Sequence, residues 1–378
     1  MVDAPKITDV RIHLVKGKLD DPIVAPFGIV SVRHNLLLAV HLDDGAVGYG
    51  EVWANFPPWG CPERVEILRN VVRPALMGRS LDSPEAITES LSGSARLLAN
   101  QMGARGPFEQ ALAGMDIALW DALAHSRGVP LRRLVADDCE RSSARVYATN
   151  LPMARAAEMI GEMAAMGHVR FKVKLPQDVD LARRGLKAAR EAAGDRPLMT
   201  DASQGYSLER LVSIADVLNE VKLDWLEEPM PVHEAEPYAR WRARPDRPPL
   251  ALGENSYGAD GFETLLADFD PDVAQPDITK TGGITLGRRL VAMSAARGKR
   301  VCLHMYGGPL GLYASAQLAA ALSEVDLVEM DSKKNPLFDV LLAEPPSVVD
   351  GEVQLSDAPG LGVTLNQRVL EEADVTEG

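Results

Sequence analysis

From about residue 143 onward, short β-rich runs alternate with helical segments, and this alternation constrains the fold more than any other feature of the chain. The helical segments are rich in Ala, Leu and Arg, as in DLARRGLKAAREAAG and TLGRRLVAMSAARG. Eight alternations are typical of a (β/α)₈-type barrel, whereas open doubly wound sheets seldom need so many units. The β-rich runs read SARVYAT, VRFKVKL, PLMTDAS, LDWLEEP, LALGEN, DVAQPDI, KRVCLHM and DLVEMD.

The first third of the chain follows another pattern, with strands first and a long helix later. We expect strands over 7–15 and 34–53, and the second stretch should fold into a hairpin at the Asp44–Gly45 turn. Apolar residues recur at helical spacing over 107–127, and the glycine and proline that follow indicate the end of that helix. Residues 1–135 therefore predict a small α+β domain.

Charge and cysteine content exclude several classes of protein. The 378 residues include 40 basic and 54 acidic side chains, a formal net charge of −14, which opposes binding to nucleic acid or to an anionic membrane. The three cysteines form no CxxC pair, so neither a disulfide framework nor a thiolate zinc site is indicated. The first residues include no apolar signal region, and no run of about 18 apolar residues follows, so we expect neither secretion nor membrane spanning. We expect a cytoplasmic protein that binds neither nucleic acid nor membrane.

An ionisable residue stands near the C-terminal end of seven of the eight predicted strands. Successive members are 23 to 27 residues apart, which is one strand and one helix. The C-terminal strand ends of such a barrel meet at one mouth, where active sites are built. Carboxylates crowded there repel one another unless a cation joins them, so the set indicates a functional site. Its members are Lys174, Asp201, Glu227, Glu254, Asp277, His304 and Glu329.

Three of these residues, Asp201, Glu227 and Glu254, come from consecutive strands and offer only oxygen ligands. Such a set favours Mg²⁺. Each has a structural alternative: Asp201 could cap the next turn, Glu228 rather than Glu227 could face inward, and Glu254 could be a surface strand end. The shared position at the strand ends favours the metal site.

Two other pairs of residues suggest proton transfer. Asp277 and His304 follow neighbouring strands, and a hydrogen bond between them would orient the imidazole and raise its basicity. The alternative is a helix-capping Asp277 beside a core histidine. Lys172 and Lys174 in RFKVKLPQD share one face of a strand. On a solvated face they have no special meaning, whereas at a barrel mouth each would lower the pKa of the other.

Taken in order, these motifs resemble those of the enolase superfamily, and specifically its mandelate racemase group. They are KVK, TDAS, WLEEP, GEN, PDITKTGG, LHM and VEMD on strands two to eight, and ALAGMDIALWDAL in the first domain. The resemblance implies a (β/α)₇β TIM-like barrel over 143–335 with an α+β capping domain over 1–135. It also implies that 336–378 returns to the capping domain and that the chain forms a homo-oligomer, from dimer to octamer.

The resemblance gives a role to each proton carrier. Lys174 matches the base on one face of a small carboxylate substrate, while Lys172 would contact that carboxylate and help depress the pKa of Lys174. His304, oriented by Asp277, matches the acid/base on the opposite face. Glu329, in its protonated form, would hydrogen-bond the substrate carboxylate as negative charge grows there.

The resemblance also implies one Mg²⁺ ion per active site, held by Asp201, Glu227 and Glu254. The muconate lactonizing branch of the superfamily has a lysine on the sixth strand, and Lys280 lies in that motif. Alignment on the following GG pair places Asp277 there instead, which disfavours cycloisomerase and dipeptide epimerase activities. Ser203 stands where the family often has Asn, a longer partner for the lysines or the metal.

Substrate specificity is expected to reside in two cap loops. APFGIVSVRHN, read as a loop, offers Arg33 and His34 as donors to hydroxyls or a distal carboxylate, whereas WANFPPWG offers Trp53, Phe56 and Trp59 to an apolar or compact substrate. Either set could instead serve domain packing. The predicted substrate-binding residues are Lys172, Ser203, Glu329, Arg33, His34, Trp59 and Tyr306.

Two opposed proton carriers permit two reactions. Reprotonation from the other face gives a racemase or epimerase, while loss of a β-hydroxyl with His304 as acid gives a dehydratase that forms a 2-keto-3-deoxy acid. We favour dehydration of a sugar acid because that activity is the commonest in the group that the chain resembles. A non-catalytic barrel that binds metal and carboxylate is the alternative from another class, and it predicts damaged bases, yet Lys174, Asp277 and His304 are all present.

Overall fold

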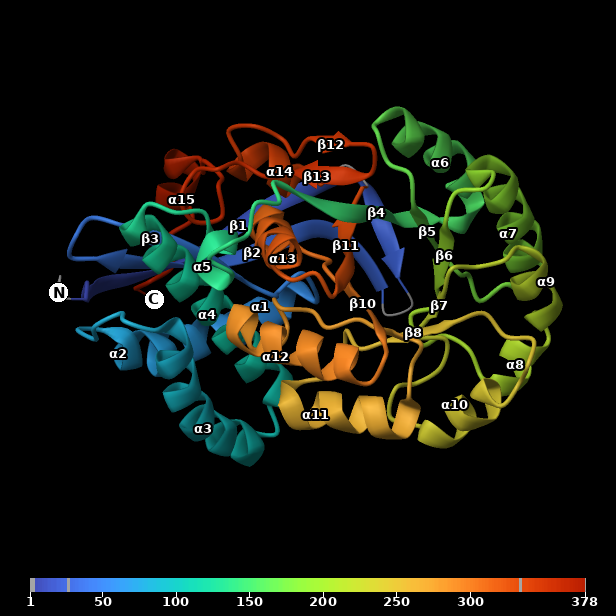
Figure 1. Cartoon of the computed structure of the whole chain (residues 1–378), viewed down its shortest axis with the longest axis horizontal. Helices are drawn as coiled ribbons and strands as arrows, with labels where there is room; N and C mark the ends of the chain where they lie inside the picture. Colours follow the sequence, from blue (N-terminus) through green and yellow to red (C-terminus); the bar gives the residue numbers. More distant parts are fainter. Residues whose placement is uncertain (1–3, 26–27, 333–334, 378) are drawn as a thin grey trace.

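The structure, a computed structural model, describes residues 4–25, 28–332 and 335–377. Its main body is a closed barrel of eight parallel strands, which lies beside a smaller antiparallel sheet (Figure 1). Each barrel strand pairs with the next along the chain, and the last pairs with the first to close the barrel. The eight predicted strands are all present, so the predicted barrel is confirmed. They are β4 (Ser143–Pro152), β5 (Phe171–Lys174), β6 (Leu198–Asp201), β7 (Leu226–Glu227), β8 (Leu250–Leu252), β9 (Val273–Ala274), β10 (Arg300–Leu303) and β11 (Val325–Asp331).

Helices cover the outside of the barrel, and several of the connections between strands have an apolar face that packs on it. In the second of these helices, the Asp178 side chain accepts a hydrogen bond from the Leu181 amide at the start, and Gly194 with φ 61° follows the end. The main helices of this layer are α6 (Ala156–Ala165), α7 (Val179–Ala193), α8 (Leu208–Val212), α9 (Ala215–Glu220), α10 (Ala235–Arg242), α11 (Gly258–Thr264), α12 (Gly283–Ala296) and α13 (Pro309–Ala321).

The inside of the barrel is filled by side chains. Tyr147 and Trp225 pack edge to face with their ring centres 5.1 Å apart, and they belong to a buried cluster with Met199, Ala251, Val273, Cys302 and Leu327. This packed layer leaves the C-terminal strand ends as the place where polar side chains gather.

The capping domain is an antiparallel sheet covered by helices. Its strands are β1 (Ile7–Ala25), β2 (Gly28–Leu42) and β3 (Val47–Val52), and its helices are α1 (Cys61–Ile67), α2 (Arg73–Leu76), α3 (Pro84–Met102), α4 (Arg105–Arg127) and α5 (Leu131–Val135). The predicted turn between β2 and β3 and the predicted helix over 107–127 are confirmed. Helix α4 lies so close to β3 that a Cβ atom at Gly48 would stand 2.0 Å from the Ala122 amide nitrogen.

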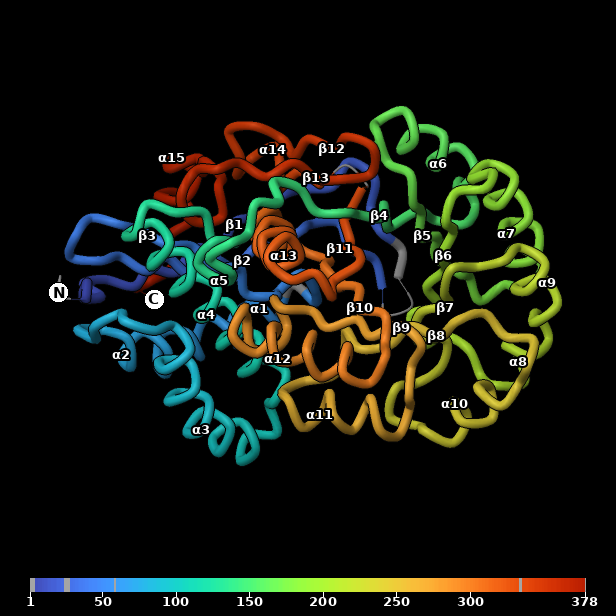
Figure 2. The backbone as a smooth tube through the Cα atoms, viewed as in Figure 1, coloured from blue at the N-terminus to red at the C-terminus, as the bar shows by residue number. Residues whose placement is uncertain are grey.

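The C-terminal segment contacts both bodies. It contains α14 (Pro336–Leu341), β12 (Val348–Val349), β13 (Glu352–Gln354) and α15 (Gln367–Glu372). Strand β13 extends the barrel sheet beside β4, while the Val375 amide donates to Ile12 O in the capping sheet. Both chain ends therefore lie beside the capping sheet (Figure 2). The exact domain boundaries stay a prediction. Within the described residues, none of the helices has the length and apolar character needed to cross a membrane.

Candidate active site at the barrel mouth

Lys172 and Lys174 point from β5 toward the mouth of the barrel, while Phe171 and Val173, which alternate with them along the strand, are buried on the other face. The Lys172 ammonium lies 2.6 Å from Glu227 Oε1 and 2.8 Å from Glu329 Oε1. Its side chain is 1% exposed, so these two carboxylates compensate a fully buried charge.

The Lys174 ammonium has a different partner, the carboxylate of Asp201, and it also lies 3.3 Å from Ser203 Oγ. The predicted lowering of the Lys174 pKa by the charge of Lys172 is confirmed as a contribution, but the net shift has the opposite sign. Burial and Lys172 do lower the pKa of Lys174, but Asp201 outweighs them and raises it. For Lys172, likewise, Glu227 and Glu329 overcome burial and raise the pKa. Both lysines are therefore charged in this state.

The three acids predicted to bind metal all lie at the mouth. Asp201 and Glu227 end β6 and β7, and Glu254 stands two residues beyond β8. Burial raises the pKa of Glu227 to about 7, and the charges of Asp201 and Glu329 add to this rise against Lys172. The three acids thus contact protein cations: Asp201 contacts Lys174, Glu227 contacts Lys172 and Glu254 contacts His304.

The donor set at the mouth fits a divalent cation. Within the described part of the chain, one trio of potential ligand atoms lies within 4.8 Å of one another, and it comes from Glu227, His304 and Glu329. Only Glu227 of this trio belongs to the predicted set. The predicted set offers carboxylate oxygens alone, which suits Mg²⁺ better than a set with imidazole. The choice of ligands therefore stays a prediction.

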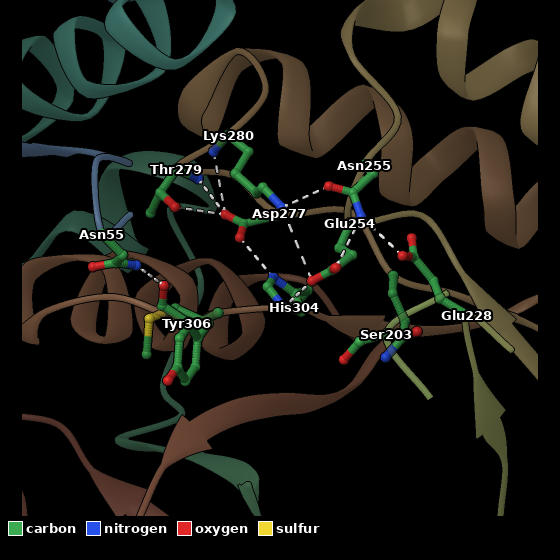
Figure 3. A network of polar contacts seen from close by, with 12 residues as sticks. Asn55, Ser203, Glu228, Glu254, Asn255, Asp277, Thr279, Lys280, His304 and Tyr306 are labelled. Atoms are coloured by element: carbon green, nitrogen blue, oxygen red, sulfur yellow. Dashed lines mark hydrogen bonds and ion pairs between the residues drawn. The ribbon is translucent and has the colours of Figure 1, made fainter. Parts of the chain in front are cut away.

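Asp277 and His304 form the predicted hydrogen bond, with 2.7 Å between Asp277 Oδ2 and His304 Nδ1 (Figure 3). The other carboxylate oxygen accepts from the Thr279 amide at 2.8 Å and the Thr279 hydroxyl at 2.6 Å. Asp277 thus stabilises its own turn and orients the imidazole at the same time. Burial would lower the pKa of His304, but Glu254, Glu329 and Asp277 outweigh it and raise the pKa.

Glu329 lies between two cations in this state, and the protonated form expected of it beside a substrate carboxylate stays a prediction. Burial alone would raise its pKa, but Lys172 and His304 lower it below the ordinary value. Glu329 Oε2 lies 3.4 Å from His304 Nε2. Glu329 is therefore a carboxylate here, and it holds Lys172 and His304 in place.

Lys280 and Glu228 form a second polar group beside Glu254. The Lys280 ammonium donates to Asn255 Oδ1 at 3.0 Å, lies 3.9 Å from Glu254 Oε2, and stands 4.9 Å from the Trp53 ring centre. Glu228 accepts from Asn255 Nδ2 at 2.8 Å, and burial raises its pKa to about 8. Glu227 and Glu228 are both buried. Glu227 contacts Lys172, whereas Glu228 contacts Asn255 (Figure 3).

The predicted loop around Arg33 and His34 is wrong, because both residues belong to strand β2. Arg33 is buried, forms an ion pair with Asp331 on β11, and lies 4.3 Å from the centre of the Tyr306 ring. It is therefore committed to the contact between cap and barrel rather than free to meet a distal substrate group. His34 is also buried, and Trp59 is 81% exposed.

Sequence reasoning missed two polar residues near the mouth. Asp331 lies two residues after Glu329 on β11, so the strand period of two could have placed both on one face. Asn55 donates to the backbone carbonyl of Tyr306, two residues after His304 (Figure 3). That contact joins the cap to the barrel, and no local pattern in the sequence predicts it. Burial raises the pKa of Tyr306 to about 12, and the Arg33 guanidinium lies 4.3 Å from the centre of its ring.

Two family models match the chain. The model described as mandelate racemase / muconate lactonizing enzyme, N-terminal domain, matches residues 7–136. The model described as enolase C-terminal domain-like matches residues 153–369.

Several relatives match most of the chain. A D-galactarolactone cycloisomerase from Agrobacterium fabrum (strain C58) is 31% identical, over 97% of this chain and 98% of that protein. An L-talarate/galactarate dehydratase from Salmonella typhimurium (strain LT2) is 30% identical, over 73% of this chain and 68% of that protein. The crystal structure of a mandelate racemase/muconate lactonizing enzyme from Bordetella bronchiseptica RB50 is 35% identical and has a TM-score of 0.87, over 98% of this chain and 99% of that one.

Proposed function

The chain belongs to the enolase superfamily, in its mandelate racemase/muconate lactonizing enzyme group, and we propose that it dehydrates a sugar acid to a 2-keto-3-deoxy acid with Mg²⁺ as cofactor. The observation that carries the proposal is the placement of two proton carriers at one mouth. Lys174 lies on β5, and His304, held by Asp277, follows β10. Contacts of Asp201 with Lys174 and of Glu254 with His304 place acidic groups beside both carriers.

The difficulty of the reaction explains why such a site is needed. A proton next to a carboxylate is very weakly acidic, and its removal leaves two negative charges on oxygen. Mg²⁺, when bound by the acids of the mouth, supplies positive charge that stabilises this negative charge and neutralises those acids. Solved structures with this fold hold bound magnesium, which supports the choice of cation.

Each residue of the mouth then has one task. Lys172 holds the substrate carboxylate. Once Asp201 is neutralised, the positive charge of Lys172 lowers the pKa of Lys174. Lys174 takes the proton from the α-carbon as the C–H bond breaks. His304 gives its Nε2 proton to the β-hydroxyl, the C–O bond breaks, and water leaves. The enol that remains becomes the 2-keto-3-deoxy acid, and Asp277 holds the imidazole in orientation throughout.

The comparisons favour a second candidate, cycloisomerisation. Asp277 at the sixth strand disfavours that class, but one of the relatives, at 31% identity over 97% of this chain, is a cycloisomerase. Such a reaction uses the same two proton carriers, with a ring oxygen in place of the β-hydroxyl. Racemisation stays the third outcome. Dehydration is preferred because dehydratases of talarate/galactarate, arabinonate, xylonate and rhamnonate recur among the relatives.

The test incubates the Mg²⁺-loaded protein in D₂O with galactarate, arabinonate, xylonate, rhamnonate and galactarolactone. A 2-keto acid formed from an open-chain acid with loss of water supports dehydration, whereas isomerisation of the lactone to an open-chain 2-keto acid without loss of water supports cycloisomerisation. Deuterium in recovered substrate of inverted configuration supports racemisation. No product and no exchange with any of these acids would overturn the proposal.

Variants at the two proton carriers assign their roles. Lys174→Met should abolish deuterium exchange and dehydration together, because proton abstraction precedes the loss of water. His304→Asn should abolish dehydration while exchange by Lys174 persists. Circular dichroism serves as the control for folding, and full dehydration by a folded His304→Asn protein would refute the role of His304.

A further inference from the structure

Glu51 of the cap reaches into the barrel domain, although no motif pointed to it. It lies on β3 and is 1% exposed. Its Oε1 accepts from the Gly308 amide at 2.6 Å, and its Oε2 accepts from the Gly311 amide at 2.8 Å. These amides stand at the start of α13, where the first helical N–H groups have no partner within the helix. A carboxylate is favoured there by hydrogen bonding and by the helix dipole.

The sequence GGPLG at the start of α13 leaves room for this contact. A Cβ atom at Gly307 would stand 2.3 Å from Glu51 Oε1, and a Cβ at Gly308 would stand 2.5 Å from Asn35 Nδ2. A Cβ at Gly311 would stand 2.9 Å from Thr279 Cγ2. Any larger residue at these positions would displace the side chains of Glu51, Asn35 or Thr279. The glycines and the cap carboxylate thus form one fitted interface.

The same segment carries the catalytic histidine. Strand β10 ends at Leu303, so His304 and the next four residues form the whole connection to α13. The cap holds this connection at a second point, because Asn55 donates to the carbonyl of Tyr306 (Figure 3). His304 therefore stands between a barrel strand on one side and two cap contacts on the other.

We propose that Glu51 is a positioning residue for His304: the cap fixes the loop that carries the acid, so that docking of the cap places the imidazole for its proton transfer. This inference rests on the proposed role of His304 as acid. Lys174 belongs to β5 and pairs with Asp201 of β6. Loss of Glu51 should therefore impair the step at His304 and spare proton abstraction by Lys174.

Glu51→Gln tests this with little change in side-chain volume. The amide group has one oxygen, so it can accept only one of the two backbone hydrogen bonds that the carboxylate accepts. We expect dehydration to fall by about tenfold to a hundredfold, while deuterium exchange by Lys174 stays within about twofold of the unmodified protein. The probe is the acid from the panel above that the unmodified protein dehydrates.

Asp116→Asn is the matched control. Asp116 is also a buried cap carboxylate at the start of a barrel helix, where Oδ2 accepts from the Thr285 amide of α12 at 2.9 Å. It does not belong to the loop of His304. If general weakening of the cap were the cause, Asp116→Asn would lower dehydration as much as Glu51→Gln does, and that result would overturn the proposal.

A readout without substrate separates this proposal from the proposed function. In ¹⁵N-histidine NMR of the Mg²⁺-loaded protein, the His304 signals are assigned by their loss in His304→Asn. Glu51→Gln should shift or broaden them, and Asp116→Asn should not. If Glu51→Gln does not fold, Gly307→Ala displaces the carboxylate and should have the same effect. Unchanged His304 signals in a folded variant would overturn the proposal, even if no acid of the panel reacts; inactivity of the unmodified protein would count against the proposed function alone.

Discussion

Asp116 should make the folded chain less stable as the pH rises, and Asp116→Asn should remove this dependence. The carboxylate is fully buried between the cap and the barrel, and it accepts from the Thr285 amide at 2.9 Å and from the hydroxyls of Thr285 and Thr88 at 2.5 and 2.7 Å. Burial raises its pKa from the ordinary value of 3.8 to about 7, although these hydrogen bonds oppose the rise.

The size of the effect follows from the two pKa values. At pH values between the ordinary pKa of 3.8 and the folded-state pKa of about 7, the folded chain keeps a proton on Asp116 that the unfolded chain has lost. Rising pH removes that proton from the folded state, so the free energy of unfolding falls over this window and levels off above pH 7. From about pH 5 to pH 8, the loss amounts to about 2.5 kcal/mol for this group.

The assay is urea unfolding of both proteins at these two pH values, followed by tryptophan fluorescence. Other titrating groups contribute nearly equally to both proteins, so the difference between the proteins isolates Asp116. From about pH 5 to pH 8, the free energy of unfolding of Asp116→Asn should rise by about 2 to 3 kcal/mol relative to that of the unmodified protein. A difference that is independent of pH would refute the reasoning.

Two further perturbations test the packing of cap on barrel. Arg33→Met should lower the free energy of unfolding by about 3 to 5 kcal/mol, because it breaks the buried ion pair between Arg33 and Asp331; Arg33→Met/Asp331→Leu should recover much of this, and no recovery would contradict the ion-pair explanation. Gly48→Ala should also destabilise, by at least the roughly 1 to 3 kcal/mol typical of overpacking, because its Cβ would meet the Ala122 amide at 2.0 Å. Gly93→Ala on α3, where nothing lies within 4 Å, is its control, and equal thermal midpoints would contradict the prediction.

The barrel and its ring of ionisable residues could be predicted because both depend on local periodicity. Each β-rich run is short and buried, and each functional residue lies at the end of one, as Asp201 and Glu227 end β6 and β7. The chain order alone then places these residues at one mouth. This placement did not require the distance between any two residues far apart in the sequence.

The cap and the charge states could not be predicted in the same way. APFGIVSVRHN (25–35) was expected to be a specificity loop, but pairing with β1 makes residues 28–35 part of strand β2, and residues 26–27 lie outside the described residues. The contact of Arg33 with Asp331 joins residues 298 positions apart. The sign of the Lys174 pKa shift likewise depends on whether Asp201 lies closer than Lys172, and sequence spacing does not fix that distance.

The charge balance at the mouth leads to a last prediction. The described residues there include six carboxyl groups and four cationic side chains: Asp201, Glu227, Glu228, Glu254, Asp277 and Glu329, and Lys172, Lys174, Lys280 and His304. Asp201 raises the pKa of Lys174 although burial and Lys172 oppose it, so the proposed base is charged in this state. A divalent cation on these acids would remove the opposing charge, and the pKa of Lys174 should fall when Mg²⁺ is added. Titration of ¹³C-labelled lysine by NMR, with Lys174→Met to assign the signal, measures this directly. A Lys174 titration that is the same with and without Mg²⁺ would mean that the acids of the mouth do not couple the cation to the base.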